Sequence, residues 1–264
     1  MTIGVFDSGV GGLTVLHALH DELPQVGTAY LGDTARVPYG TRSADTVIKY
    51  ALNAAQFLSE NETLSVLVVA CNTASAVAVE ELSKTLSVPV VGVIEPTAKH
   101  AVKLSNNQKI GVIGTSGTIQ SQAYETAIHK LSPDAQTFAK ACPLFVPLAE
   151  EGWTSPDDPL VCQIVERYLG DLVKEDIDTL ILGCTHYPLL ASAISKVLPP
   201  RIRLADAAQA VAREVAAHSS EEFENEESSR PLRRYYVTDV PKGFVRVAER
   251  FLGAAIEKPI EVDL

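Results

Sequence analysis

Short apolar runs rich in β-branched residues alternate along the chain with longer stretches of helical period. The predicted strand and helix pairs are residues 3–6 with 13–23, 28–31 with 44–58, and 66–70 with 74–86. Further strands are predicted at residues 90–93, 109–113, 137–141, 179–182, 202–204 and 233–238, and a last helix at residues 242–252. Near-continuous apolar strands between amphipathic helices are typical of a mostly parallel sheet covered on both faces. We therefore predict an α/β fold.

An internal repeat divides this pattern into two parts. The strand and loop at residues 3–9 (IGVFDSG) resemble those at residues 110–117 (IGVIGTSG). A cysteine at the end of an apolar run follows each loop at a comparable distance, Cys71 after the first and Cys184 after the second. We therefore predict two similar, doubly wound α/β lobes with mostly parallel sheets, related by a pseudo-twofold axis.

The predicted domain boundaries follow from this division. The first lobe comprises residues 1–95 plus 208–264 and the second comprises residues 96–207, with the active site in the cleft between them. Hinges are predicted near residues 94–96 and near Asp206. The acidic segment at residues 221–227 (EEFENEE) is predicted to be a solvated loop or linker.

Composition narrows the class of protein. The formal net charge of −11 argues against a surface for nucleic acid or anionic membrane. No run of about 18 apolar residues is present, and the chain runs straight into a strand without the pattern of a secretory signal. The four cysteines lack Cys-x-x-Cys spacing, which suits free thiols in a reducing compartment. We expect a cytoplasmic protein that binds neither nucleic acid nor membrane.

Cys71 and Cys184 lie in matching local settings. Each closes an apolar run and opens a polar segment that is predicted to begin a helix, where the pKa of a thiol falls below its usual value of about 8.5. A buried cysteine can also be a small apolar core residue, but the polar neighbours of both argue against that reading. Two thiols from equivalent elements could face one small molecule from opposite sides, as acid and base of a proton transfer that inverts a stereocentre.

The polar residues that follow the predicted strands form one rim, because ligands of parallel α/β sheets gather at the carboxyl ends of the strands. The members of this rim are Asp7, Ser8, Asp33, Thr34, Cys71, Asn72, Thr73, Thr115, Ser116, Cys184, Thr185 and His186. Hydroxyl groups, an amide and free helix N–H groups there would suit a small anionic substrate.

The same residues allow other kinds of site. His186 beside Cys184 is compatible with acyl transfer by a cysteine nucleophile, although the second cysteine then has no role. The Cys-x-His spacing matches no familiar metal site, and residues 9–12 (GVGG) lack the spacing of a dinucleotide fingerprint. No lysine stands in a context typical of a pyridoxal phosphate anchor. We therefore expect neither a metal nor an organic cofactor.

Four segments, in this order, carry a family resemblance over nearly the full length. They are residues 5–13 (VFDSGVGGL), 30–34 with 38–40 (YLGDT, PYG), 70–75 (ACNTAS) and 183–188 (GCTHYP). The chain resembles the glutamate racemases of bacterial cell-wall synthesis, and aspartate racemases share the general plan. The resemblance implies a cofactor-independent isomerase that interconverts L- and D-glutamate and supplies the D-isomer for peptidoglycan, and hence for cell wall biogenesis and cell shape.

The resemblance also implies roles for individual residues. Cys71 would take the α-proton from D-glutamate and Cys184 from L-glutamate, with Asp7 assisting the first thiol and His186 the second. Glu150 matches a family glutamate near that histidine, with Glu151 as the alternative register. The residues that resemble the substrate-holding set are Asp7, Ser8, Tyr39, Gly40, Asn72, Thr73, Thr115, Thr118, Thr185 and His186, to which the rim adds Asp33.

Departures and alternatives qualify the resemblance. Alanines follow Asp206 where family members often carry a serine, and the chain starts at its first strand, so activation by a cell-wall precursor is not expected. Family members are often dimers, which makes a homodimer one expected form. The alternatives are a racemase for aspartate or another acidic amino acid, and a non-catalytic regulator that binds a protein such as DNA gyrase.

Overall fold

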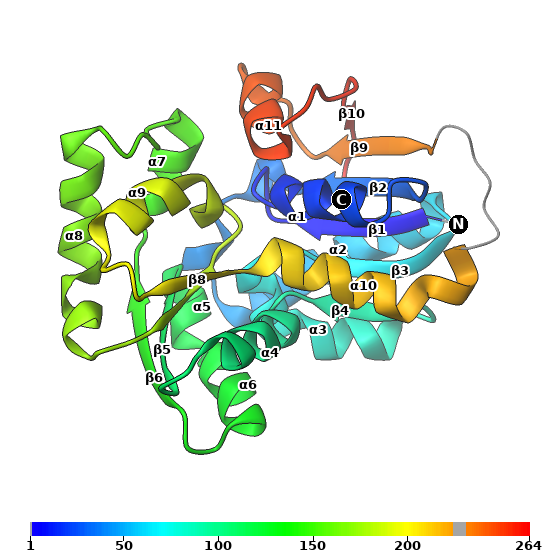
Figure 1. The fold of residues 1–264 in the computed structure, drawn as a ribbon. Helices are drawn as coiled ribbons and strands as arrows, with labels where there is room; N and C mark the ends of the chain where they lie inside the picture. The colour runs from blue at the N-terminus through cyan, green and yellow to red at the C-terminus, as the bar shows by residue number, and fades with distance from the viewer. Residues whose placement is uncertain (1, 224–230) are drawn as a thin grey trace.

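The computed structural model describes residues 2–223 and 231–264, and it contains two parallel sheets that lie side by side (Figure 1). The first has the strand order β10-β9-β2-β1-β3-β4 and the second β6-β5-β7-β8, and every pair is parallel. The strands of the first sheet are β1 (Thr2–Asp7), β2 (Gly27–Gly32), β3 (Leu64–Val69), β4 (Val90–Gly92), β9 (Arg233–Val237) and β10 (Ile260–Glu261). Those of the second are β5 (Lys109–Gly114), β6 (Gln136–Ala141), β7 (Thr179–Gly183) and β8 (Arg203–Asp206). The predicted α/β class is confirmed.

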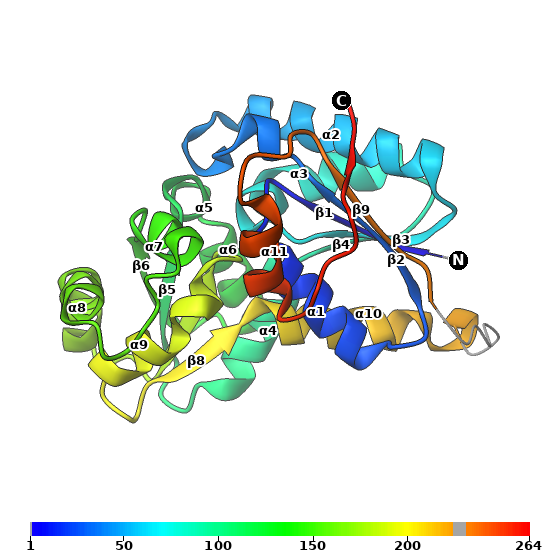
Figure 2. The ribbon, with the colours of Figure 1, turned by 90° about the horizontal axis from the view of Figure 1, so that it is seen from above.

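Helices cover both faces of the first sheet (Figure 2). On one side lie α1 (Leu13–Glu22), α10 (Ala207–Phe223) and α11 (Phe244–Leu252); on the other lie α2 (Ala44–Asn61) and α3 (Asn72–Thr85). Successive side chains of a strand point to opposite faces, so Ile3 and Val5 join the core under α1 while Phe6 joins the core under α2 and α3. This burial on both faces explains the uninterrupted apolar runs in the sequence.

The second sheet is covered in the same way. Its helices are α4 (Ile94–Leu104), α5 (Ser116–Gln120), α6 (Ala123–Leu131), α7 (Phe145–Glu151), α8 (Pro159–Lys174) and α9 (Ala191–Val197). Ile113 and Leu182 pack with buried residues of α7, α8 and α9, whereas Val112 and Ile181 pack with those of α4 and α6. Val112 and Ile181 belong to the same continuous apolar cluster as Ile3 and Val5 of the first sheet. The two sheets therefore share one core at this side of the molecule.

The predicted strands and the helices that precede the second sheet are all present, with ends that differ by at most three residues from the prediction. The short edge strand β10 was not predicted. The predicted hinge near residues 94–96 coincides with the start of α4 at Ile94. The first turn of this helix accommodates Pro96, because an N–H at that position would have no partner within the helix. The predicted boundary between residues 95 and 96 therefore falls inside this helix.

The acidic segment at residues 221–227 also differs from its prediction. Helix α10 continues to Phe223, so residues 221–223 are helical rather than a loop, and residues 224–227 lie outside the described part of the chain. The second predicted hinge falls where β8 ends at Asp206 and α10 begins at Ala207. Within the described ranges, no helix combines the length and the apolar character needed to cross a membrane.

Candidate active site

The carboxyl ends of the central strands of the two sheets meet at one place. Asp7 ends β1, Cys71 follows β3, Thr115 follows β5 and Cys184 follows β7. In the registers of the sheets, Phe6 pairs with Val69 and Gly114 pairs with Gly183, so each cysteine lies beside the end of its neighbouring strand. The rim that was predicted from the sequence is therefore assembled from both sheets.

Three threonine hydroxyls join the two sides of this rim. Thr73, on α3, lies 2.9 Å from the hydroxyl of Thr115 and 3.3 Å from that of Thr118, and the last two are 3.0 Å apart. Thr115 caps α5 by accepting a hydrogen bond from the Thr118 amide. Each hydroxyl can donate one proton and accept two, so the cluster can reorganise around a bound carboxylate.

Two glycines allow the backbone of one side to touch the other. A Cβ atom at Gly11 would lie 2.1 Å from Oγ1 of Thr185 and 2.5 Å from Nδ1 of His186. A Cβ atom at Gly40 would lie 2.7 Å from Cβ of Thr115. Any side chain at these positions would push the two sides of the rim apart, which is a physical reason for glycine in the GVGG and PYG segments.

Cys71 is the N-cap residue of α3, as predicted, and it is 5% exposed. The predicted lowering of its pKa is wrong. Burial raises the pKa of the Cys71 thiol to about 12, and the negative charge of Asp7 adds to this, while the Ser8 hydroxyl and a helix N–H oppose it only in part. The helix N-terminus is too weak an influence to overcome loss of solvent and a neighbouring carboxylate.

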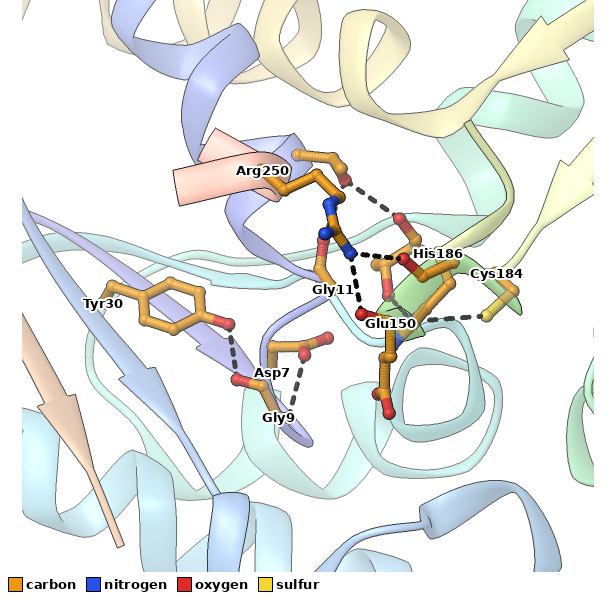
Figure 3. Close-up of polar contacts among 11 residues, drawn as sticks. Asp7, Gly9, Gly11, Tyr30, Glu150, Cys184, His186 and Arg250 are labelled. Carbon is orange, nitrogen blue, oxygen red and sulfur yellow. Dashed lines mark hydrogen bonds and ion pairs between the residues drawn. The ribbon is translucent and has the colours of Figure 1, made fainter. Parts of the chain in front are cut away.

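Asp7 is fully buried, and one of its carboxylate oxygens has no partner among the described residues. The other, Oδ2, accepts a hydrogen bond from the Gly9 amide at 2.9 Å (Figure 3). Burial raises the pKa of Asp7 above its usual value, although the charge of His186 and nearby backbone N–H groups act in the other direction. A buried carboxylate oxygen without a donor is costly, so Oδ1 is suited to accept a proton or to bind a cationic group.

Asn72 supplies a complementary unpaired group. Its Oδ1 accepts a hydrogen bond from the Tyr124 hydroxyl at 2.6 Å, which fixes the orientation of the amide. The Nδ2 atom is buried and finds no partner in the part of the chain that the structure describes. The site thus holds a donor at Asn72 as well as an acceptor at Asp7.

Cys184 is the end of a chain of three side chains (Figure 3). Its sulfur lies 3.9 Å from Nδ1 of His186, and Nε2 of His186 lies 2.9 Å from Oε1 of Glu150. Burial alone would lower the pKa of His186, but its contacts with Cys184 and Glu150 outweigh burial and raise the pKa to about 10. Cys184 and Glu150 therefore both favour the imidazolium form of His186.

The local backbone around Cys184 differs from the prediction. No α-helix begins there, because residues 184–186 form turns that lead into the short 3-10 helix η3 (Tyr187–Leu190) before α9. The Tyr187 and Leu189 amides donate to the carbonyls three residues earlier, and Pro188 has no N–H to donate to an α-helical bond. Glu150, rather than Glu151, points to His186, since Glu151 lines a shallow apolar groove with Leu144 and Trp153.

Asp33 and Tyr39 are engaged with each other. The Tyr39 hydroxyl donates to Oδ2 of Asp33 at 2.5 Å, and Arg36 and the Thr238 hydroxyl donate to the same carboxylate. Both carboxylate oxygens of Asp33 therefore accept hydrogen bonds from the protein itself. Asp33 therefore supports Tyr39 and the Gly40 segment, and its contact with substrate stays a prediction.

Other residues at the site were not predicted from the sequence. Phe251 of α11 packs its ring edge-on to His186, with ring centroids 4.9 Å apart, and Arg250 donates to backbone carbonyls beside Glu150. The Tyr30 hydroxyl donates to the Gly9 carbonyl at 2.8 Å and so holds the loop after β1. The only sequence signal for the α11 residues is the apolar period of residues 244–252, which predicts a helix but not what it covers.

Among the described residues, no group of three or more His, Cys, Asp or Glu side chains is placed to hold a metal ion.

Comparison with known proteins agrees with this geometry. The model of the Asp/Glu/Hydantoin racemase family matches residues 3–215, so the chain belongs to that family. A glutamate racemase of Geobacter metallireducens is 50% identical over 99% of this chain and 96% of its own length. Two solved structures are similar over nearly all of both chains. Glutamate racemase isoform RacE1 from Bacillus anthracis has 42% identity and a TM-score of 0.93, with 100% of this chain and 97% of that chain covered. The Francisella tularensis glutamate racemase in complex with D-glutamate has 37% identity and a TM-score of 0.92, with 99% of this chain and 97% of that chain covered. The expectation of an isomerase of this racemase family is confirmed.

Proposed function

We propose that this protein interconverts L- and D-glutamate by proton transfer between two cysteines. The observation that carries the proposal is the placement of Cys71 and Cys184 at strand ends of different sheets, on one polar rim. Within the described residues, this rim also holds a hydrogen-bond acceptor without a partner on Asp7 and a donor without a partner on Asn72. The choice of glutamate rests on the relatives described above, which are named glutamate racemases and include one whose structure contains D-glutamate.

In the proposed reaction, each thiol serves one face of the α-carbon. Starting from L-glutamate, the Cys184 thiolate takes the α-proton and the Cys71 thiol returns its own proton to the opposite face. The products are D-glutamate, a Cys184 thiol and a Cys71 thiolate, and the reverse reaction restores the first state. The raised pKa of Cys71 supports its role as the proton donor in this direction, and the contact of His186 with the Cys184 sulfur supports Cys184 as the partner base.

The chemical difficulty is the weak acidity of the α-proton, which the site must offset electrostatically. The substrate carboxylates would be bound by hydroxyl groups of Thr73, Thr115, Thr118 and Thr185, the Asn72 amide and backbone amides near Ser8 and Gly40. The unpaired Oδ1 of Asp7 would accept a hydrogen bond from the α-ammonium or from the Cys71 thiol. Fixed donors in a water-poor site stabilise a developing carbanion by several kcal/mol.

The setting of the reaction follows from the same proposal. The active site lies in the cleft between the two lobes, residues 1–95 plus 208–264 and residues 96–207, and lobe closure over the substrate would exclude water. D-glutamate made in the cytoplasm would supply peptidoglycan synthesis. A homodimer, which the family resemblance implies, is tested by light scattering of the eluted protein in gel filtration.

The deciding experiment uses pure, chelator-treated protein in heavy water with L-glutamate or D-glutamate. We expect optical rotation to decay from both enantiomers, and ¹H NMR to show deuterium entering the α-position of the inverted product. Parallel reactions with L- and D-aspartate test the sister specificity. Turnover of aspartate alone would contradict the choice of glutamate, and no turnover of either would contradict an acidic amino acid racemase and leave the regulatory alternative.

A further inference from the structure

Helix α11 reaches the site from the far end of the sequence. It packs against α1 on the first sheet, and two consecutive residues, Arg250 and Phe251, contact the Cys184 side of the rim. Figure 3 shows the guanidinium of Arg250 directed at the backbone of Glu150. Residues of the first sheet's helical layer therefore touch the Glu150–His186–Cys184 chain, which belongs to the second sheet.

The guanidinium closes the end of α7. Its Nη1 donates to the carbonyl of Glu150 at 2.8 Å and to that of Ala149 at 3.3 Å, in the last turn of the helix, where carbonyls lack the usual amides of a following turn. Gly152, with a φ of 80°, ends the helix in the left-handed conformation, and its amide donates to the Ala149 carbonyl as well. A Cβ atom at Gly152 would lie 2.6 Å from Cζ of Arg250, so the glycine also leaves the space that the guanidinium fills.

Glu150 needs such support. Its side chain is 45% exposed, whereas that of His186 is 9% exposed. An exposed glutamate side chain loses rotamer entropy when it is fixed, and an ion pair at a surface usually stabilises by less than this loss. A seven-residue helix is also marginal by itself. Without an anchor for its backbone, Glu150 would hold His186 only part of the time.

We propose that Arg250 is a positioning residue, which fixes the backbone of Glu150 so that its carboxylate holds His186 against Cys184. Phe251 packs edge-on against the imidazole of His186. The inference rests on the proposed function, since it assigns Arg250 to the half of the reaction that Cys184 carries out, but its structural part concerns only Glu150 and His186.

The test compares Arg250→Met, which keeps most of the side-chain length, with Arg246→Met as a matched control. Arg246 is exposed one turn earlier on the same helix, so the control makes the same change of charge. We expect kcat for glutamate to fall about ten- to a hundredfold in Arg250→Met, as for a small misplacement of a reacting group, and to stay at the wild-type value in Arg246→Met. Arg250→Lys, which can still reach one carbonyl, should recover much of the loss.

Two readouts separate positioning from general damage. The equilibrium constant between enantiomers is one, so kcat/KM must fall equally in both directions, and the primary isotope effect carries the directional information. With 2-deuterated L-glutamate the isotope effect should rise in Arg250→Met, because proton removal by Cys184 becomes more rate-limiting, while with 2-deuterated D-glutamate it should fall. Unchanged kcat, or a lower kcat with both isotope effects unchanged, would overturn the proposal.

The second readout does not need turnover. The groups that face His186 are Cys184 and Thr185 on its own segment, Glu150 on α7, Asp7 at the end of β1 and Phe251 on α11. NMR titration of labelled histidine should place the pKa of His186 lower in Arg250→Met than in the wild type and Arg246→Met, since a displaced Glu150 no longer favours the imidazolium. If the wild type fails to racemise glutamate, the proposed function fails, yet this titration still decides the role of Arg250. An identical His186 titration in all three proteins would refute it.

Discussion

A single methyl group at Gly11 should separate catalysis from folding. In Gly11→Ala the new Cβ would lie 2.1 Å from Oγ1 of Thr185 and 2.5 Å from Nδ1 of His186. Ordinary contacts of a Cβ atom begin at about 3.4 Å, so these side chains, or the loop, must move by roughly 1 Å. The left-handed backbone region is not involved, which leaves the steric clash as the main effect of the substitution.

The expected magnitude follows from that displacement. A shift of about 1 Å in a catalytic group can cost about a hundredfold in rate, which corresponds to about 2.7 kcal/mol in the activation free energy. Overpacking of a close-packed site costs about 1–3 kcal/mol of folding stability. We therefore expect kcat for glutamate to fall about a hundredfold while the protein remains folded at room temperature.

The assay has two parts and one control. Racemisation is followed by the decay of circular dichroism from each enantiomer, and the free energy of unfolding is measured by urea denaturation. A Cβ atom at Gly170, within α8, would have no described heavy atom of another segment within 4 Å, so Gly170→Ala should keep wild-type activity and gain about 0.5–1 kcal/mol of stability. Wild-type kcat in Gly11→Ala would refute the claim that the two sides of the rim are held in direct contact at this glycine.

Two further predictions concern the cysteines and pH. Cys71→Ala and Cys184→Ala should each abolish racemisation without unfolding the protein. Cys142→Ala and Cys162→Ala should retain turnover. Measurable racemisation in both directions by Cys71→Ala or Cys184→Ala would disprove the two-base assignment. Burial and the nearby charge of Arg233 lower the pKa of His20 from its usual 6.5 to about 4. Between pH 4 and pH 6.5, His20 is therefore protonated in the unfolded chain but neutral in the folded protein. Stability should therefore fall by at most about 3 kcal/mol as pH drops from 7 to 4, and His20→Gln, compared by urea denaturation across that range, should lose this part of the dependence.

The sequence predicts the sheet well because its strands are buried on both faces. Val5 and Phe6, or Ile181 and Leu182, are apolar whichever way they point, and this signal is local. The two cysteines could be found for a related reason, since the first polar residues after such strands lie at the carboxyl edge. Glu150 was found only by resemblance, and the choice between it and Glu151 depended on which side of α7 faces His186.

The remaining features depend on contacts between distant parts of the chain. Arg250 meets the Glu150 carbonyl across 100 positions of sequence, and nothing near residue 250 indicates that contact. The pKa of Cys71 was predicted in the wrong direction because the sequence reveals its helix N-terminus but not its burial beside Asp7. The sequence neighbours of Asp33 likewise do not reveal Thr238, which donates to its carboxylate from 205 positions away.

The position of β9 in the first sheet has a consequence for biosynthesis. β9 pairs with β2, although residues 28–32 are translated some 200 positions earlier than their partners at 233–237. Until β9 emerges from the ribosome, β2 exposes a row of unpaired backbone groups, the kind of edge that recruits chaperones or other nascent chains. Arg250 emerges later still, so every residue of the rim is synthesised before the side chain that anchors Glu150. The newly made chain therefore gains its fully ordered site only when its last helix, α11, has been synthesised.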